Sequence, residues 1–234
     1  MTIAIMQPYF LPYIGYFQLI NSVDSFVIYD NIKYTKKGWI NRNRMLVNGK
    51  DEYFSVPLQK DSDFLNVVER QLAEIFLQEN QKTLRKIKEV YKKAPQISNV
   101  LEVVESIFNN NERNLFNFIF HSIKQINEYL DIQTKLIISS TIPVDHQLKG
   151  ADKVMAICKS LNAGKYINPV GGQELYDKTI FGKENLELKF LLSKPFEYMQ
   201  FGNTFVPWLS ILDVIMFNDR DTIKDYLNNA YQLI

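Results

Sequence analysis

The chain is poor in cysteine, histidine and long apolar runs. Its 234 residues contain a single cysteine, Cys158, so no disulfide can form within the chain. The two histidines, His121 and His146, lack metal-ligand spacing, and we expect no metal site. No apolar run approaches the roughly 18 residues of a membrane span, and the N-terminus lacks the basic and apolar regions of a signal peptide. These absences predict a cytoplasmic protein of a reducing compartment.

The chain also lacks an excess of charge of either sign. The formal net charge is +1, so the field of the whole molecule argues against DNA or another polyanionic partner. A local basic cluster within residues 33–44 is too slight to establish tRNA binding. Apolar residues make up 46% of the chain, which is enough for a sizeable core. We therefore expect one α/β domain over residues 1–234.

Residues 2–30 carry the clearest structural pattern. An apolar strand at 2–6 stops at a polar glutamine and two prolines, and a helix with apolar periodicity follows at about 14–22. A second apolar strand at 25–29 then ends on Asp30. In open α/β sheets, ligands bind where strands end and helices begin. The loops at 7–15 and 30–44 are therefore the first candidates for function.

The remaining chain predicts further strands and helices around this unit. Asn48-Gly49 between two extended runs predicts a hairpin at about 44–58, because a type I′ turn needs positive φ. Residues 78–130 predict a helical insertion, or a lid, of three helices. We expect strands at 135–139, 166–167 and 186–192, and helices at 150–161, 173–181, 208–217 and 221–231. The predicted fold is a mainly parallel, Rossmann-like central sheet flanked by helices.

The N-terminal loop supplies the first candidate binding residues. Gln7 can both donate and accept hydrogen bonds at the end of a strand, and Gly15 would admit a ligand to the helix N-terminus, which favours an anion. The tyrosines Tyr9, Tyr13 and Tyr16 suit a partly wet pocket, because the ring packs while the hydroxyl seeks a partner. The alternative is a rigid strand-to-helix connection with no ligand.

A second group of candidates follows in the Trp-Ile-Asn-Arg-Asn-Arg segment. Arg42 and Arg44 are two residues apart, so they point to the same side of an extended segment, and their guanidinium groups suit a phosphate or carboxylate. Trp39 offers a face for a base or a sugar. The segment supplies the candidates Trp39, Asn41, Arg42, Asn43 and Arg44. The alternative is a solvated edge strand.

Two side chains are candidates for proton transfer. His146 lies between a strand and a helix, and histidine suits a general base near neutral pH. Asp30 ends a strand and is the other candidate base, with a turn or helix-capping aspartate as its structural alternative. Beside them, Lys149 could hold a phosphate, and the turn at Gly171 and Gly172 could bind an anion through backbone N–H groups.

The sequence resembles the WbqC-like protein family over nearly its whole length. The resemblance lies in the segments 6–17, 27–30, 39–44, 149–163, 171–172 and 205–213. One departure is Asn31, which stands where many members have a second acid after Asp30. A remoter likeness of Pro12-Tyr13-Ile14-Gly15-Tyr16 links the first helix to nucleotidylyltransferases, but Tyr16 replaces their histidine.

The resemblance implies an enzyme of bacterial O-antigen or other surface-polysaccharide biosynthesis. It suggests a glycine transferase, which moves a glycyl or similar acyl group to the amine of an amino sugar. The expected partners are an amino-sugar nucleotide or a lipid-linked sugar, together with an activated acyl donor on an unknown carrier. The sequence leaves the cofactor unidentified. The alternatives are a nucleotidylyltransferase-like or ATP-dependent ligase enzyme and a non-catalytic partner of polysaccharide enzymes.

Overall fold

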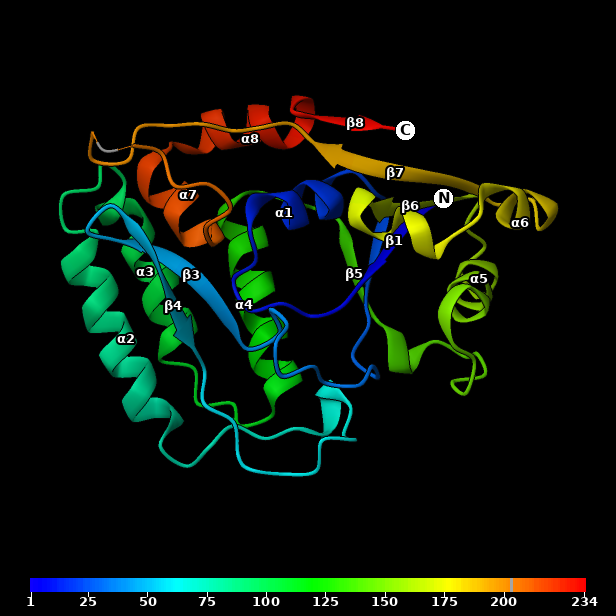
Figure 1. Cartoon of the computed structure of the whole chain (residues 1–234), viewed down its shortest axis with the longest axis horizontal. Helices are drawn as coiled ribbons and strands as arrows, with labels where there is room; N and C mark the ends of the chain where they lie inside the picture. The colour runs from blue at the N-terminus through cyan, green and yellow to red at the C-terminus, as the bar shows by residue number, and fades with distance from the viewer. Residues whose placement is uncertain (203) are drawn as a thin grey trace.

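A mixed sheet of mostly parallel strands forms the centre of the molecule (Figure 1). The computed structural model describes residues 1–202 and 204–234. Strands β5, β2, β1, β6 and β7 run parallel in that order, and β8 pairs with β7 in the antiparallel direction. The strands are β1 (Thr2–Met6), β2 (Ser25–Ile28), β5 (Lys135–Ile138), β6 (Lys165–Pro169), β7 (Glu187–Ser193) and β8 (Tyr231–Leu233). The predicted α/β fold class is confirmed.

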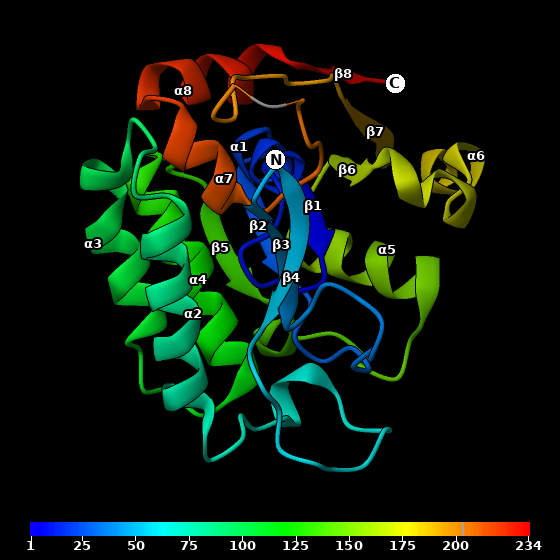
Figure 2. The same cartoon turned by 60° about the vertical axis from the view of Figure 1, so that its left-hand side comes forward.

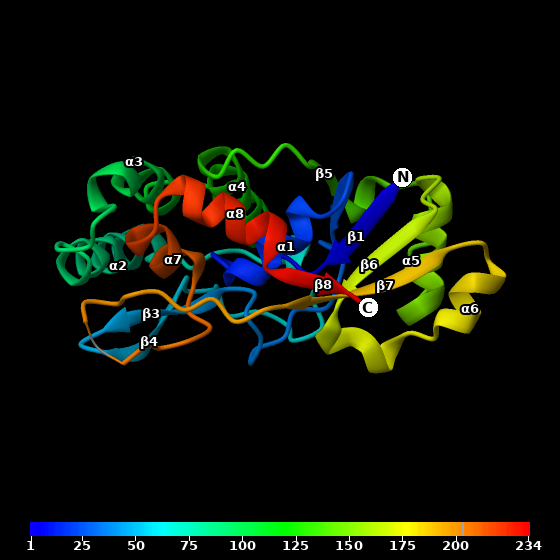
Figure 3. The same ribbon diagram turned by 90° about the horizontal axis from the view of Figure 1, so that it is seen from above.

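Helices cover both faces of this sheet. In β1 the side chains alternate, so that Ala4 joins one apolar cluster while Ile3 and Ile5 join the other. The face of Ala4 is covered by α1 (Ile14–Asn21) and α8 (Arg220–Asn229). The opposite face is covered by α5 (Gly150–Ser160) and α6 (Lys178–Lys183), as Figure 3 shows from above. Burial on both faces explains why these strands read as continuous apolar runs.

The predicted hairpin is present as β3 (Arg42–Val47) and β4 (Lys50–Ser55), which form a separate antiparallel pair. Its turn residues Asn48 and Gly49 have φ of 51° and 75°, the two positive values that a type I′ turn requires. Strand β3 packs against α7 (Ile211–Phe217), away from the central sheet (Figure 3). The hairpin therefore ties the first quarter of the chain to its last quarter.

Residues 78–130 form helices, as predicted. They are α2 (Phe76–Val90), α3 (Ile97–Phe108) and α4 (Leu115–Tyr129), which lie side by side in Figure 2. Their apolar faces belong to the same cluster as Ala4 and Phe10, and the rings of Phe10 and Phe118 lie 5.5 Å apart. Short 3₁₀ turns complete the structure: η1 (Val67–Glu69), η2 (Ser139–Thr141) and η3 (Val170–Leu175).

Three helix predictions near the C-terminus were wrong in their bounds. The predicted helix 173–181 is divided into η3 and α6, because the Asp177 side chain accepts from Thr179 N and starts a new helix. The predicted helix 208–217 begins only at 211, where the Ser210 hydroxyl caps Leu212 N. The predicted helix 221–231 ends at 229, and its last predicted residue starts β8, whose pairing with β7 is a long-range contact.

A buried carboxylate holds α7 in place. Asp213 is fully buried and accepts hydrogen bonds from Tyr91 Oη (2.9 Å), Tyr198 Oη (2.6 Å) and Gln200 Nε2 (2.6 Å). Burial raises the pKa of Asp213, and these three hydrogen bonds oppose that shift. Tyr91 Oη also accepts from Leu46 N at 3.0 Å. The network therefore joins α2, α7 and the hairpin through one buried tyrosine.

Replacing Tyr91 with Phe should lower the free energy of unfolding by about 1–3 kcal/mol, because Leu46 N–H and Asp213 each lose a buried partner. Urea unfolding measures the change. The matched control is Tyr53→Phe at an exposed tyrosine, where we expect a change within about 0.5 kcal/mol. Equal effects of the two substitutions would contradict the role assigned to the Tyr91 hydroxyl.

Candidate functional site

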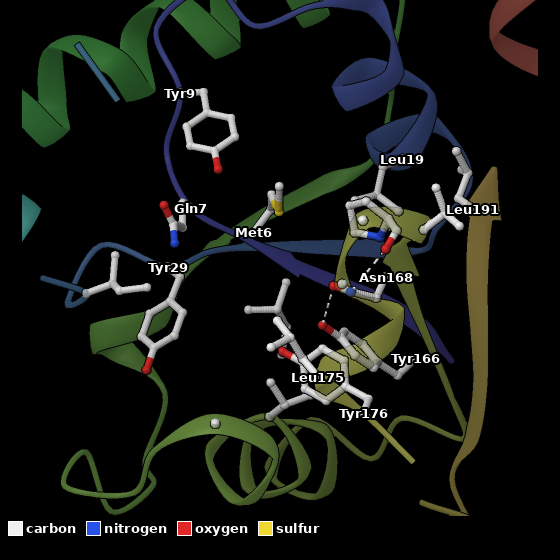
Figure 4. Close-up of a pocket in the computed structure, with 18 of the residues that line it drawn as sticks. Met6, Gln7, Tyr9, Leu19, Tyr29, Tyr166, Asn168, Leu175, Tyr176 and Leu191 are labelled. Carbon is white, nitrogen blue, oxygen red and sulfur yellow. Dashed lines mark hydrogen bonds between the residues drawn. The ribbon is translucent and has the colours of Figure 1, made fainter. Parts of the chain in front are cut away.

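A cleft of about 1050 Å³ opens at the carboxyl ends of the parallel strands. Gln7 follows β1, Tyr29 follows β2, Asn168 lies near the end of β6, and Ser193 ends β7. Figure 4 shows several of these side chains around the open space, with the Tyr9 hydroxyl directed into it. The chain leaves β1 toward β2 on one side and reaches β6 on the other, so the cleft lies at a topological switch point.

The cleft is lined by cationic groups without opposing carboxylates. The lysines Lys33 and Lys149 line it, and within residues 1–202 and 204–234 no aspartate or glutamate does so. Helix α5 begins at Gly150, which also lines the cleft, and its first free N–H groups add partial positive charge. The arrangement favours an anionic ligand, such as a phosphate or a carboxylate.

The helical insertion takes no part in this cleft. None of the lining residues lies between 67 and 145, a stretch that the structure describes throughout. Helices α2, α3 and α4 instead bury their apolar faces in the core beside the sheet. The expectation that this segment acts as a lid is therefore wrong for this cleft.

His146 Nδ1 is contacted by two nitrogen groups, neither of which the sequence analysis identified as its partner. Lys153 Nζ lies 2.7 Å from His146 Nδ1 and donates to Asp145 O at 3.2 Å, while Asn31 Nδ2 lies 2.9 Å from the same Nδ1. Lys153 is only 1% exposed, although it stands in the first turns of α5. A lysine within an otherwise apolar helix face was the one available signal.

The geometry restricts where the His146 proton can lie. An ammonium group only donates hydrogen bonds, so Nδ1 is an acceptor when Lys153 is charged, and the neutral ring then carries its proton on Nε2. When Nδ1 carries the proton, Lys153 must be neutral to accept it, and the Asn31 amide must turn its oxygen toward Nδ1, because the Asn31 NH₂ group can only donate. Burial lowers the pKa of Lys153, while the Asp145 carboxylate opposes that shift.

Asp30, the other candidate base, does not reach the cleft. Its side chain is fully buried, and Oδ1 accepts from Ser140 N at 2.8 Å, at the start of η2. Asp30 is absent from the lining, and its Oδ2 has no partner among the described residues. The position matches the structural alternative of a turn aspartate.

Four of the five candidate residues of the N-terminal loop line the cleft, and the fifth, Tyr16, does not. Gln7, Tyr9, Tyr13 and Gly15 line the cleft. Tyr16 is buried outside the lining, and its hydroxyl donates to Gln7 O at 3.0 Å, so it supports the loop from behind. A Cβ at Gly15 would lie 2.3 Å from the Tyr13 ring. The glycine is therefore needed to seat Tyr13 over the start of α1.

The two arginines already have protein partners. Arg42 donates to Gly38 O and Lys37 O at 3.0 and 2.7 Å and does not line the cleft. Arg44 donates to Asp51 Oδ2 and Trp208 O, both at 3.0 Å. The predicted placement of these arginines on a phosphate in the main cleft therefore does not match their positions.

The asparagines of the same segment organise backbone. Asn41 accepts from Tyr34 Oη and donates to Val56 O, both at 2.9 Å. Asn43, which is 4% exposed, donates to Leu11 O at 2.8 Å and to Phe10 O at 3.2 Å. Asn41 lies outside the cleft lining, whereas Trp39, Asn43 and Arg44 line a smaller compartment beside it.

The turn after β6 lies on the cleft where it was expected. Gly171 and Gly172 line it within η3. A Cβ at Gly172 would lie 2.1 Å from Asn168 Nδ2, so the glycine allows the buried Asn168 to approach the turn. Tyr166 Oη donates to Asn168 Oδ1 at 3.0 Å (Figure 4).

On helix α5, burial raises the pKa of the Cys158 thiol to about 12, which disfavours a nucleophilic thiolate.

Neither a metal nor a membrane feature accompanies the cleft. Within the described residues, no cluster of three or more histidine, cysteine, aspartate or glutamate side chains is placed to hold a metal ion. None of the helices in residues 1–202 and 204–234 combines the length and the apolar character needed to cross a bilayer.

Comparison with known proteins gives one family. The model of the WbqC-like protein family matches residues 7–225. The uncharacterized protein Rv1507c of Mycobacterium tuberculosis is 26% identical over 234 residues, which cover 98% of this chain and 99% of that protein. No solved structure gives a significant match. The matched region contains every lining residue of the cleft except Ile5 and Met6.

Replacing Lys153 with Met should change how stability depends on pH. Because the pKa of Lys153 is lowered on folding, the unfolded chain binds more protons below the ordinary value of 10.5. The wild-type protein should therefore gain stability relative to Lys153→Met as the pH rises through the lowered pKa of Lys153 toward 10.5.

Urea unfolding at a series of pH values measures this difference. The control is Lys159→Met on the same helix, where the side chain is 59% exposed and pairs with Glu184. That variant should follow the wild-type pH dependence. Parallel curves for wild type and Lys153→Met would contradict the lowered pKa of Lys153 in the folded protein.

Proposed function

The chain belongs to the WbqC-like protein family, and from that premise we propose that it is a transferase of bacterial surface-polysaccharide biosynthesis. The reaction moves a glycyl or other acyl group to the amine of an amino sugar. The acceptor is a nucleotide-linked or lipid-linked sugar, and both carry phosphate. The acyl group comes from an activated donor.

The observation that supports this proposal is the charge of the cleft. Lys33, Lys149 and the N-terminus of α5 face a space of about 1050 Å³ without an opposing carboxylate among the described residues. A phosphate of the acceptor would neutralise this charge, and backbone N–H groups at the helix start can bind it directly. The volume is sufficient for a sugar nucleotide together with an acyl group.

The chemistry requires one proton acceptor. As the amine attacks the activated carbonyl carbon, the C–N bond forms, the bond to the carrier breaks with its electron pair, and the amine nitrogen loses a proton. In the proposed mechanism the reactive state has the His146 proton on Nδ1, Lys153 neutral and the Asn31 amide oxygen turned toward Nδ1. His146 then takes the amine proton at Nε2, while its Nδ1 proton passes to Lys153 across the 2.7 Å contact. His146 is then the catalytic base, and Lys153 is a positioning residue that receives the proton.

An ATP-dependent ligase or nucleotidylyltransferase receives less support from the same cleft. Enzymes that use Mg²⁺-nucleotides commonly hold the ion through one or two carboxylates, and no described carboxylate side chain lines this space. The charge instead suits a phosphate that is bound directly by lysines and backbone.

Replacing His146 with Gln should lower the transfer rate by about 10²–10⁴-fold with little change in acceptor binding. The assay supplies activated glycyl donors, including glycyl-tRNA and a glycyl thioester, with a panel of UDP- and dTDP-linked amino sugars. Mass spectrometry detects the acylated sugar. The proposal is overturned when neither these sugars nor a lipid-linked amino sugar is acylated by the wild-type protein.

Replacing Lys149 with Met should weaken binding of the phosphate-bearing acceptor about tenfold or more, because a charge-assisted contact is lost. Calorimetric titration measures the dissociation constant. The matched control is Lys50→Met in the hairpin turn, which lies outside the cleft lining. Equal affinities for both variants would remove Lys149 from the proposed phosphate site.

A further inference from the structure

A second compartment of about 220 Å³ adjoins the main cleft. Tyr9, Tyr13 and Trp208 line both spaces, so a single ligand can occupy the two together. Trp39 and Arg44 line the rest of this second compartment, together with Pro12 and Asn43. The compartment is therefore lined mainly by aromatic residues, and its size suits one flat ring rather than a chain of sugars.

Both tryptophans of the chain lie in this compartment. Trp39 is stacked on Tyr53, with ring centroids 6.0 Å apart and planes at 14°. Trp208 meets Tyr13 edge to face, with centroids 5.9 Å apart and planes at 69°. Trp208 nevertheless stays 59% exposed. Its indole therefore keeps a large face that no protein group covers.

The backbone holds Trp208 in an unfavourable conformation. Its φ is 59°, a left-handed value that is rare for a bulky side chain and costs free energy. Arg44 donates to Trp208 O at 3.0 Å, and Ser210 N donates to Arg44 O at 2.9 Å. The hairpin thus fixes this exposed ring beside the cleft, although the small burial of the ring contributes little to stability.

Polar atoms without partners accompany the rings. The hydroxyls of Tyr9 and Tyr13 make no hydrogen bond among the described residues. The Nε of Arg44 is buried and has no partner there either. A buried donor without a partner is costly. These groups can bind the polar edge of a ring that stacks on the tryptophans.

We propose that this compartment binds the base of a nucleotide whose phosphate lies in the main cleft. Stacking of a base on aromatic side chains contributes substantially and tolerates different bases. Tyr9, which lines the compartment, lies across the cleft from the yellow-green helix α5 in Figure 4. The base and the phosphate at α5 would therefore occupy opposite ends of the cleft. That the nucleotide carries an amino sugar rests on the proposed function, whereas binding of the base does not require transfer.

Tryptophan fluorescence tests this directly, because both tryptophans line the compartment. We would titrate the full chain with UMP, dTMP, CMP and AMP, and with glucosamine 1-phosphate and inorganic phosphate, which lack a base. At least one nucleotide should quench or shift the emission, while the ligands without a base should not. The single-tryptophan variants Trp39→Phe and Trp208→Phe assign the signal to each ring.

The variant Trp208→Ala should bind the responsive nucleotide about tenfold more weakly by calorimetry, the order expected for one lost stacking contact. The matched control is Phe201→Ala, which removes another exposed ring at positive φ outside the compartment and should leave affinity unchanged. The inference is overturned when no nucleotide changes the emission, when glucosamine 1-phosphate gives the same change, or when both variants bind equally. A response to AMP alone would support the inference while weakening the amino-sugar transferase.

Discussion

The carbonyl group of Leu11 is the point at which three distant parts of the chain are joined. It accepts hydrogen bonds from Asn43 Nδ2 at 2.8 Å and from Ser210 Oγ at 2.7 Å, and Leu11 itself has a φ of 45°. One contact comes from the hairpin and the other from the residue that caps α7. The strained loop is stable because both of its neighbours fix it. Without this junction, neither Trp39 nor Trp208 would have a defined place beside the cleft.

This junction explains why the Trp-Ile-Asn-Arg-Asn-Arg segment at 39–44 is rich in polar residues. Its polar side chains read as ligand contacts in the sequence, because nothing local showed that they had partners. Asn43 in fact satisfies two backbone carbonyls in the interior, and Arg44 reaches the Trp208 carbonyl. Buried polar groups must be paired, so an asparagine in such a segment can be as constrained by the fold as by a substrate. The one aromatic residue of the segment, Trp39, lines the smaller compartment.

Local patterns were sufficient for much of the fold. The apolar runs of β1 and β2, the Asn48-Gly49 turn and the periodicity of α2, α3 and α4 each depend on neighbouring residues. The cleft could be placed from the rule that parallel strands present their carboxyl ends together. The contact of Lys153 with His146 could not be found, because it follows from how the loop before α5 folds back. Strand β8 was missed for a similar reason, since only its pairing with β7 makes it extended.

The way α1 is anchored has a consequence for folding kinetics. Gln18 Nε2 donates to Tyr226 O and Ala230 O, contacts that span 208 and 212 residues of sequence. Such distant contacts are slow to form, because a long loop must close before they stabilise anything. The loop that bears Gln7, Tyr9 and Tyr13 therefore reaches its final shape late, after the C-terminal helices have docked.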